Sequence, residues 1–180
     1  LAIRTVFNIL GPLTNPAGAS RQLMGVFDGA LVQPLAGVLK QLGSTAAFVV
    51  HGDGALDELS TSGINTVAYF GCNGAGDTIV TTLLDPRDFG FDPSPRDAFK
   101  GGDAEENAAI SRAILEGRER GAKRDVVLLN AAAALTAGGI VPTLAEGVAL
   151  AAATLDSRAA LNTLENLIAF TNSVAVTVES

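Results

Sequence analysis

The sequence predicts an α/β fold with a mostly parallel central sheet flanked by helices and a helical C-terminal half. Two observations lead to this prediction. A helical pattern over residues 31–42 is followed by the short apolar run AAFVV and a glycine-rich loop. After residue 103, the sequence contains mainly motifs that begin helices. The 180 residues, 48% of them hydrophobic, suit one domain, residues 1–180, with one sizeable core.

The first fifty residues give turn, helix and strand signals in that order. Residues 4–27 mix short apolar runs with the rigid turn GPLTNP, residues 11–16, which indicates a turn-rich segment. Leucines and valines recur at helical spacing over residues 31–42, and Gly43 suits the C-cap of that helix. The run AAFVV, residues 46–50, is short and apolar, so we expect a buried strand.

The middle of the chain carries β-branched residues and turn chemistry. The runs TVAYF, residues 66–70, and TIVTTLL, residues 78–84, flank the turn GCNGAGD and predict a hairpin or a two-strand excursion. Residues 85–103 are rich in proline and aspartate and are too long for a simple turn, so we expect a surface connection.

The C-terminal half predicts successive helices. A D-x-x-E capping box at residues 103–106 precedes the first, and a T-x-x-E box at residues 143–146 precedes a helix that reaches about Leu155. Between them, RDVVLLNAAAALTA, residues 124–137, is nearly all apolar and indicates an interior helix. A last helix begins at Ser157 with leucines on one face.

Charge and composition exclude several classes of protein. The net charge of −7 comes from 12 basic and 19 acidic residues without a basic cluster, which disfavours nucleic-acid binding. No run of about 18 uncharged apolar residues could span a bilayer. The opening LAIRTVFNILGP contains an arginine and no A-x-A cleavage site, so it is not typical of a signal peptide, and a cytoplasmic location is the default expectation.

Cys72 and His51 are the only residues of their kinds. One cysteine excludes an internal disulfide. With only one cysteine and one histidine, most transition-metal sites are excluded as well. A nucleophilic triad would have to use His51, and no serine stands in a G-x-S-x-G context. An anionic substrate would therefore need a local cation, a helix N-terminus or a bound metal.

The loop HGDGALDELS follows the predicted strand AAFVV and holds the main candidate site. Ligands of α/β proteins usually bind beyond the carboxyl ends of strands. Asp57 and Glu58 supply the hard oxygen ligands that Mg²⁺ prefers, especially when phosphate oxygens complete its octahedron. An acidic pair on a surface loop can also be merely solvated, and spacing alone leaves both interpretations open.

Three further candidates have both a functional and a structural interpretation. Arg4, in the apolar context LAIRTVFN, could grip a carboxylate or phosphate with two parallel hydrogen bonds, or could anchor the turns that follow. The segment GGDAEEN, residues 101–107, could face a phosphate, but its acidic side chains favour helix capping. His51 could be a hydrogen-bonded residue at a strand end or a catalytic group.

Five motifs follow one another along the chain: RTVFNILGPLTNPA, QLMGVFD, VVHGDGALDELS, GGDAEENAAI and VLLNAAAAL. In order and spacing they resemble anthranilate phosphoribosyltransferase, the family that transfers a phosphoribosyl group from 5-phosphoribosyl 1-diphosphate to anthranilate in tryptophan biosynthesis. The resemblance implies that Arg4 contacts the anthranilate carboxylate and that Asp57 and Glu58 hold Mg²⁺ on the diphosphate. It also implies a homodimer for the full-length enzyme.

The sequence departs from that family in one respect. Members carry an N-terminal helical region, a G-T-G-G-D type loop and a K-H-G-N type segment, none of which occurs in these 180 residues. The resemblance thus implies a single catalytic domain of the C-terminal type shared by nucleoside phosphorylases and phosphoribosyltransferases. Three alternatives stay open: a pyrimidine nucleoside phosphorylase, a non-enzymatic nucleic-acid binder, which the net charge disfavours, and a fragment that is inert unless it is joined to its missing half.

Overall fold

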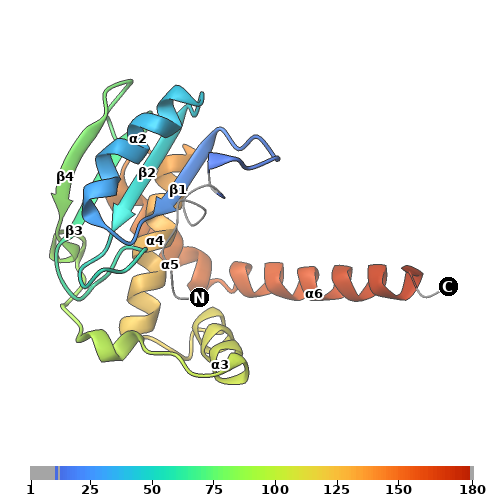
Figure 1. Ribbon diagram of the computed structural model, residues 1–180. Coiled ribbons are helices and arrows are strands. Elements are labelled where there is room, and N and C mark those ends of the chain that lie inside the picture. Colours follow the sequence, from blue (N-terminus) through green and yellow to red (C-terminus); the bar gives the residue numbers. More distant parts are fainter. Residues whose placement is uncertain (1–10, 12, 179–180) are drawn as a thin grey trace, which may run out of the picture.

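The computed structural model describes residue 11 and residues 13–178, with side chains described as far as residue 174. A four-stranded sheet lies between helix α2 on one face and helices α4 and α5 on the other (Figure 1). The elements are β1 Arg21–Gly25, η1 Gly29–Leu31, α2 Val32–Gln41, β2 Ala46–His51, β3 Asn65–Phe70, β4 Val80–Leu84, η2 Pro86–Phe89, η3 Arg96–Phe99, α3 Ala104–Leu115, α4 Ala122–Gly138, α5 Leu144–Asp156 and α6 Ala159–Val178.

The α/β class is confirmed, but the prediction of a mostly parallel sheet is wrong for the described strands. Their order is β1-β2-β3-β4, and only β1 and β2 run parallel, whereas β2-β3 and β3-β4 are antiparallel. The cause is the length and content of the connections. Helix α2 carries the chain back between β1 and β2, but residues 52–64 and 71–79 contain no crossover helix, so the chain reverses at each of them.

Strand β2 is buried on both faces, which explains its unbroken apolar sequence. Ala47 and Val49 belong to the cluster under α2, and Phe48 and Val50 to the cluster under α4 and α5. These four side chains are at most 1% exposed. Phe48 also stacks on Tyr69 of β3, with ring centroids 4.9 Å apart, so the central strands are joined by side chains as well as by the hydrogen-bond ladder.

Local signals placed most helices and the hairpin correctly. The predicted helix over 31–42 is α2, and the predicted hairpin is β3-β4. Asp103 caps α3 by accepting a hydrogen bond from the backbone N–H of Glu106 at 2.9 Å. Thr143 caps α5 in the same manner, since its Oγ1 accepts the N–H of Glu146 at 3.3 Å. Both capping boxes therefore mark true helix starts.

Helices α4 and α5 approach closely at Gly147. A Cβ atom at this position would lie 2.8 Å from the carbonyl oxygen of Ala132, too close for any side chain. The alanines of α4 thus serve the interior packing expected from the sequence. Leu128, Leu129 and Ala133 of α4 are buried in the same cluster as Phe48 of the sheet, so α4 is fixed between the sheet and α5.

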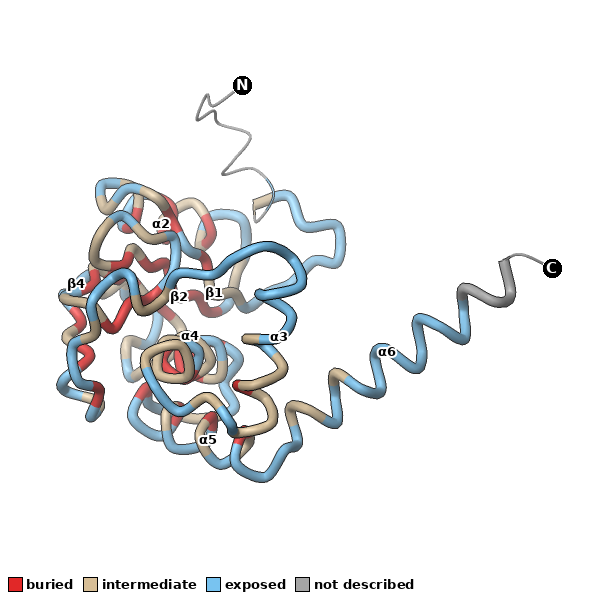
Figure 2. The backbone as a smooth tube through the Cα atoms, turned by 90° about the horizontal axis from the view of Figure 1, so that it is seen from below, coloured by how far each residue is buried: buried red, intermediate tan, exposed pale blue. Residues whose placement is uncertain are grey.

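Helix α6 extends away from the rest of the molecule (Figures 1 and 2). An ion pair of 3.1 Å between Arg112 of α3 and Glu165 ties its first turns to the body. Farther along, Leu167, Phe170 and Val174 are exposed. Within the range that the structure describes, α6 included, no helix combines the length and the apolar character needed to cross a membrane.

Candidate functional site

The acidic loop, residues 51–60, lies at the end of the sheet where the parallel strands β1 and β2 have their carboxyl ends. Strand β2 ends at His51, and the chain then forms a tight turn in which Gly52 N–H donates to the carbonyl of Leu56 at 2.8 Å. Asp57 and Glu58 follow this turn with exposed side chains. Their position beyond the carboxyl ends of the strands is the one expected from the sequence.

Two glycines let the backbone of the acidic pair rest on the strand ends. A Cβ atom at Gly25, the last residue of β1, would overlap the carbonyl oxygen of Asp57. A Cβ atom at Gly52 would overlap the carbonyl oxygen of Glu58. The role of Gly25 was missed from the sequence, although a glycine that ends a strand is a known sign of close backbone approach.

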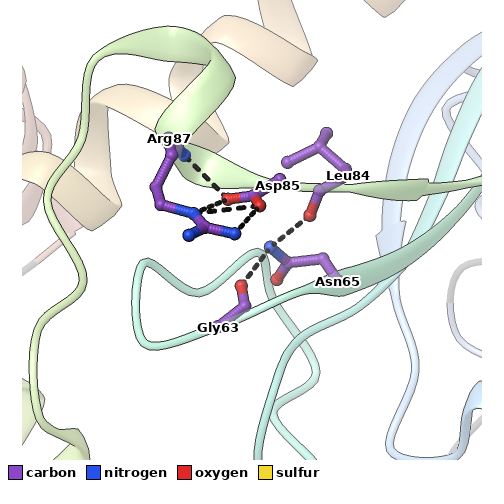
Figure 3. Close-up of polar contacts among 5 residues, drawn as sticks. All are labelled: Gly63, Asn65, Leu84, Asp85 and Arg87. Atoms are coloured by element: carbon purple, nitrogen blue, oxygen red, sulfur yellow. Dashed lines mark hydrogen bonds and ion pairs between the residues drawn. The ribbon is translucent and has the colours of Figure 1, made fainter.

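The chain that leaves the acidic pair enters the interior at once. Leu59, Ser60 and Thr61 are at most 1% exposed. The side chain of Asn65, the first residue of β3, accepts the N–H of Ser60 at 2.7 Å and donates to the Ser60 carbonyl at 3.0 Å. Figure 3 shows that the same amide also donates to the carbonyls of Gly63 and Leu84, so Asn65 fixes the end of the loop.

His51 makes the structural contact that the sequence left as one of two possibilities. Its Nδ1 lies 2.8 Å from the carbonyl oxygen of Val26, which can only accept, so Nδ1–H is the donor. The ring also lies against Gly29, where a Cβ atom would be 3.3 Å from the imidazole Cδ2. His51 therefore joins the end of β2 to the segment after β1.

The electrostatics of the acidic pair suit a divalent cation. Although Glu58 is an exposed residue, partial desolvation of its carboxyl by neighbouring atoms, and in second place the negative charge of Asp57, raise the pKa of this carboxyl. A cation between the two carboxylates would relieve this repulsion. The carboxylate of the neighbouring Asp53 makes a hydrogen bond within the connection between β2 and β3, because its Oδ2 accepts from Ser62 Oγ at 2.8 Å.

The donor set is small and consists of oxygen atoms. Among the residues that the structure describes, no three His, Cys, Asp or Glu side chains gather into a metal cage. Two neighbouring carboxylates fit Mg²⁺ none the less, because this ion usually keeps several waters and binds through one or two carboxylates together with substrate phosphates. The loop therefore fits a magnesium ion that is shared with a polyanionic ligand.

Two other candidates have different outcomes. Arg4 lies outside the residues that the structure describes. In the segment 101–107, the side chain of Asn107 accepts the N–H of Gly102 at 3.0 Å and donates to its carbonyl at 2.9 Å. Together with the Asp103 cap, this contact gives the segment the structural role that the sequence favoured.

The free thiol of Cys72 is half-buried in the turn after β3. Its sulfur lies 3.4 Å from the carbonyl oxygen of Phe70 and is positioned to donate to it. Burial raises the pKa of this thiol to about 11, although the charge of Arg21 acts in the opposite direction. A thiol in this state is a poor nucleophile near neutral pH.

Residues 1–161 match the a/b domain of a glycosyl transferase family. Two curated relatives bear the name anthranilate phosphoribosyltransferase. The protein of Chloroflexus aggregans is 50% identical over 175 residues, which are 97% of this chain and 51% of that protein. The protein of Nitrobacter hamburgensis is 54% identical over 172 residues, which are 96% of this chain and 50% of that protein.

Solved structures give the same match. The crystal structure of anthranilate phosphoribosyltransferase from Thermus thermophilus superimposes with a TM-score of 0.84 at 44% identity, covering 94% of this chain and 48% of that one. The enzyme of Saccharomyces cerevisiae in complex with PRPP and Mg gives a TM-score of 0.81 at 29% identity, covering 95% of this chain and 48% of that one. The chain thus spans about half the length of the relatives it matches.

Proposed function

The chain belongs to the glycosyl transferase family through its α/β domain, and we propose that the protein containing it is an anthranilate phosphoribosyltransferase of tryptophan biosynthesis. It would transfer the phosphoribosyl group of 5-phosphoribosyl 1-diphosphate to the amino group of anthranilate and release diphosphate. The observation that carries the proposal is the match of 96–97% of the chain to relatives of that name at 50–54% identity. The exposed acidic pair at the strand ends supports it.

Asp57 and Glu58 are the proposed holders of Mg²⁺. A structure of the yeast relative is in complex with PRPP and Mg. Bound to the diphosphate, the ion would neutralise the negative charge that develops as the leaving group departs. The contribution of this chain is to hold two carboxylates on a backbone that rests on the ends of two strands.

The reaction needs no nucleophile from the protein. The aromatic amine forms the new bond to C1 of the ribose, and the bond from C1 to the diphosphate oxygen breaks with its electron pair going to that oxygen. The amine nitrogen then loses a proton to water. The described side chains agree with this chemistry, because the raised pKa of the only thiol, Cys72, makes it a poor nucleophile near neutral pH. Most of the rate would then come from holding the two substrates in line.

We assign the anthranilate carboxylate to Arg4, on the strength of the motif RTVFN alone. A guanidinium can hold a carboxylate with two parallel hydrogen bonds, which fixes the plane of the aromatic ring. A structure of the yeast relative contains 4-fluoroanthranilate, so that protein accommodates an aromatic amino acid of this shape. The resemblance also supports a homodimer, which analytical ultracentrifugation of the protein containing this chain would test.

A direct assay tests the proposal. The protein containing these 180 residues is incubated with anthranilate, 5-phosphoribosyl 1-diphosphate and Mg²⁺, and the fluorescence of anthranilate is followed. We expect the fluorescence to fall only when donor and metal are both present. Constant fluorescence, together with phosphorolysis of thymidine or uridine, would instead assign the protein to the pyrimidine nucleoside phosphorylases.

A further inference from the structure

A single side chain of a distant helix grips the backbone directly after the acidic pair. Asn130 of α4 accepts the N–H of Leu59 through Oδ1 at 2.9 Å and donates from Nδ2 to the Leu59 carbonyl at 2.7 Å. The two residues are 71 positions apart in the sequence. One amide thus satisfies both backbone groups of the residue that follows Glu58.

Asn130 is itself held in place. Its Nδ2 makes a second hydrogen bond, to the carbonyl of Val126 one turn earlier in α4, at 2.9 Å. All the polar atoms of the amide therefore have partners, and the side chain has one favoured orientation. Because the preceding residues Leu128 and Leu129 are buried under the sheet, α4 is a firm support for this contact.

The grip on Leu59 limits how far the acidic pair can move. The Leu59 side chain is fully buried in the core cluster of α4 and the sheet. Within the pair itself, the Asp57 and Glu58 carbonyls lie against Gly25 and Gly52. The backbone of the pair is therefore packed against the strand ends, and the residue that follows it is held by Asn130.

We propose that Asn130 is a positioning residue for the metal-binding function of the loop, and this inference rests on the proposed function. In this proposal Asn130 acts through the backbone, because its two hydrogen bonds hold Leu59, the residue directly after Asp57 and Glu58. Metal ligands must be held within about 0.5 Å of the productive geometry by the groups around them. Loss of such an outer partner typically lowers metal affinity or activity by about 10- to 100-fold.

Two substitutions separate this role from simple stabilisation of the fold. Asn130→Ala removes all three hydrogen bonds of the amide. Asn130→Ser removes the contact to Leu59, but its hydroxyl can still reach the Val126 carbonyl, as the hydroxyl of Thr136 reaches the Ala132 carbonyl at 2.8 Å in the same helix. The serine variant thus preserves α4 if the alanine variant folds poorly.

Asn107→Ala is the matched control. Asn107 makes the same pair of side-chain contacts to the N–H and the carbonyl of one residue, Gly102, in a different loop. Removing it takes away the same number of side-chain hydrogen bonds to a loop, without touching the acidic pair. Any effect found only at Asn130 therefore reports on the acidic loop.

The first readout is hydrogen exchange of the protein containing this chain, without substrate or metal. In both Asn130 variants, we expect exchange of the Leu59 amide to rise roughly ten-fold or more, because it loses its acceptor. Exchange in the middle of α4 should stay the same in Asn130→Ser, and the loop should be unchanged in Asn107→Ala. Unchanged exchange at Leu59 would overturn the inference at this step.

The second readout is the Mg²⁺ dependence of turnover with anthranilate and 5-phosphoribosyl 1-diphosphate. We expect the half-saturating Mg²⁺ concentration of Asn130→Ser to rise about 10- to 100-fold, with kcat largely recovered at high Mg²⁺. A lower kcat with the wild-type Mg²⁺ requirement would mean that Asn130 serves the fold alone and would overturn the inference. Absence of turnover in the wild-type protein would instead refute the proposed function, which separates the two failures.

Discussion

His51 and Val26 are joined by a hydrogen bond of 2.8 Å between the imidazole Nδ1 and the backbone carbonyl oxygen. The bond links the end of β2 to the segment that follows β1. These two strands are neighbours and run parallel, so the contact joins their carboxyl ends next to the acidic loop. The only histidine of the chain is thus used to hold the loop's surroundings in place.

We predict that His51→Ala lowers the free energy of unfolding by about 1 kcal/mol, the usual value of one such hydrogen bond. His51→Asn should lose less, because the asparagine amide can present a donor close to the position of Nδ1. Urea denaturation of both variants measures the difference. Equal unfolding midpoints for His51→Ala and the wild-type protein would contradict the structural role.

The double substitution Asp57→Asn with Glu58→Gln should abolish Mg²⁺-dependent turnover and leave the fold intact. Both side chains are exposed, and their removal relieves the repulsion that contributes to the raised pKa of Glu58. Turnover and thermal unfolding are measured side by side. Glu105→Gln with Glu106→Gln, an exposed acidic pair in α3, is the control of equal charge; wild-type rates in the first double variant would refute the metal role.

Arg4→Ala should raise the KM for anthranilate much more than the KM for 5-phosphoribosyl 1-diphosphate. The reason is that the proposed guanidinium contact is made to the carboxylate of anthranilate alone. Steady-state kinetics with each substrate varied in turn give both values. If the two KM values rise by the same factor, Arg4 does not have the assigned role.

The Cys72 thiol should react with alkylating reagents only at a higher pH than an exposed thiol does. Burial raises the pKa of the folded thiol to about 11, so little thiolate exists at pH 8. We expect iodoacetamide to alkylate the native protein much more slowly at pH 8 than the urea-unfolded protein, with a native rate that rises until about pH 11. Similar native and unfolded rates at pH 8 would show that the thiol is not shielded.

The raised pKa of the Cys72 thiol also makes the stability of the fold depend on pH. The folded state holds the thiol proton more tightly than the unfolded state does, so deprotonation favours unfolding. The stabilising contribution is complete below the unfolded pKa, about 8.5, and is lost as the pH rises through the folded pKa. Cys72→Ser should therefore lose less stability than the wild-type protein when the pH is raised from about 8 to 10.

The features that were predicted correctly depend on neighbours in the sequence. The helix over 31–42 follows from its apolar spacing, and the caps at Asp103 and Thr143 follow from two short motifs. The antiparallel pairing of β2 with β3 was not recognised from the sequence. The reason is that AAFVV, which forms most of β2, is typical of a buried strand in a parallel or an antiparallel sheet. The connection after it decides the pairing, and that connection has no helix.

The candidate site was predicted only in part, for a related reason. The position of Asp57 and Glu58 beyond a strand end follows from local sequence. The residues that support the pair come from elsewhere: Gly25 from another strand and Asn130 from a helix 71 positions beyond Leu59. No local pattern marks contacts of that span, so the supporting residues became visible only in three dimensions.

The described strands lie side by side in the order in which they are synthesised. Each strand can dock on the one made just before it, which keeps the entropy cost of closing the intervening loops low. The acidic loop is made before its anchor Asn130, which arrives only with α4. During translation the sheet can therefore take shape first, and the support of the acidic loop is completed only when α4 packs against the sheet.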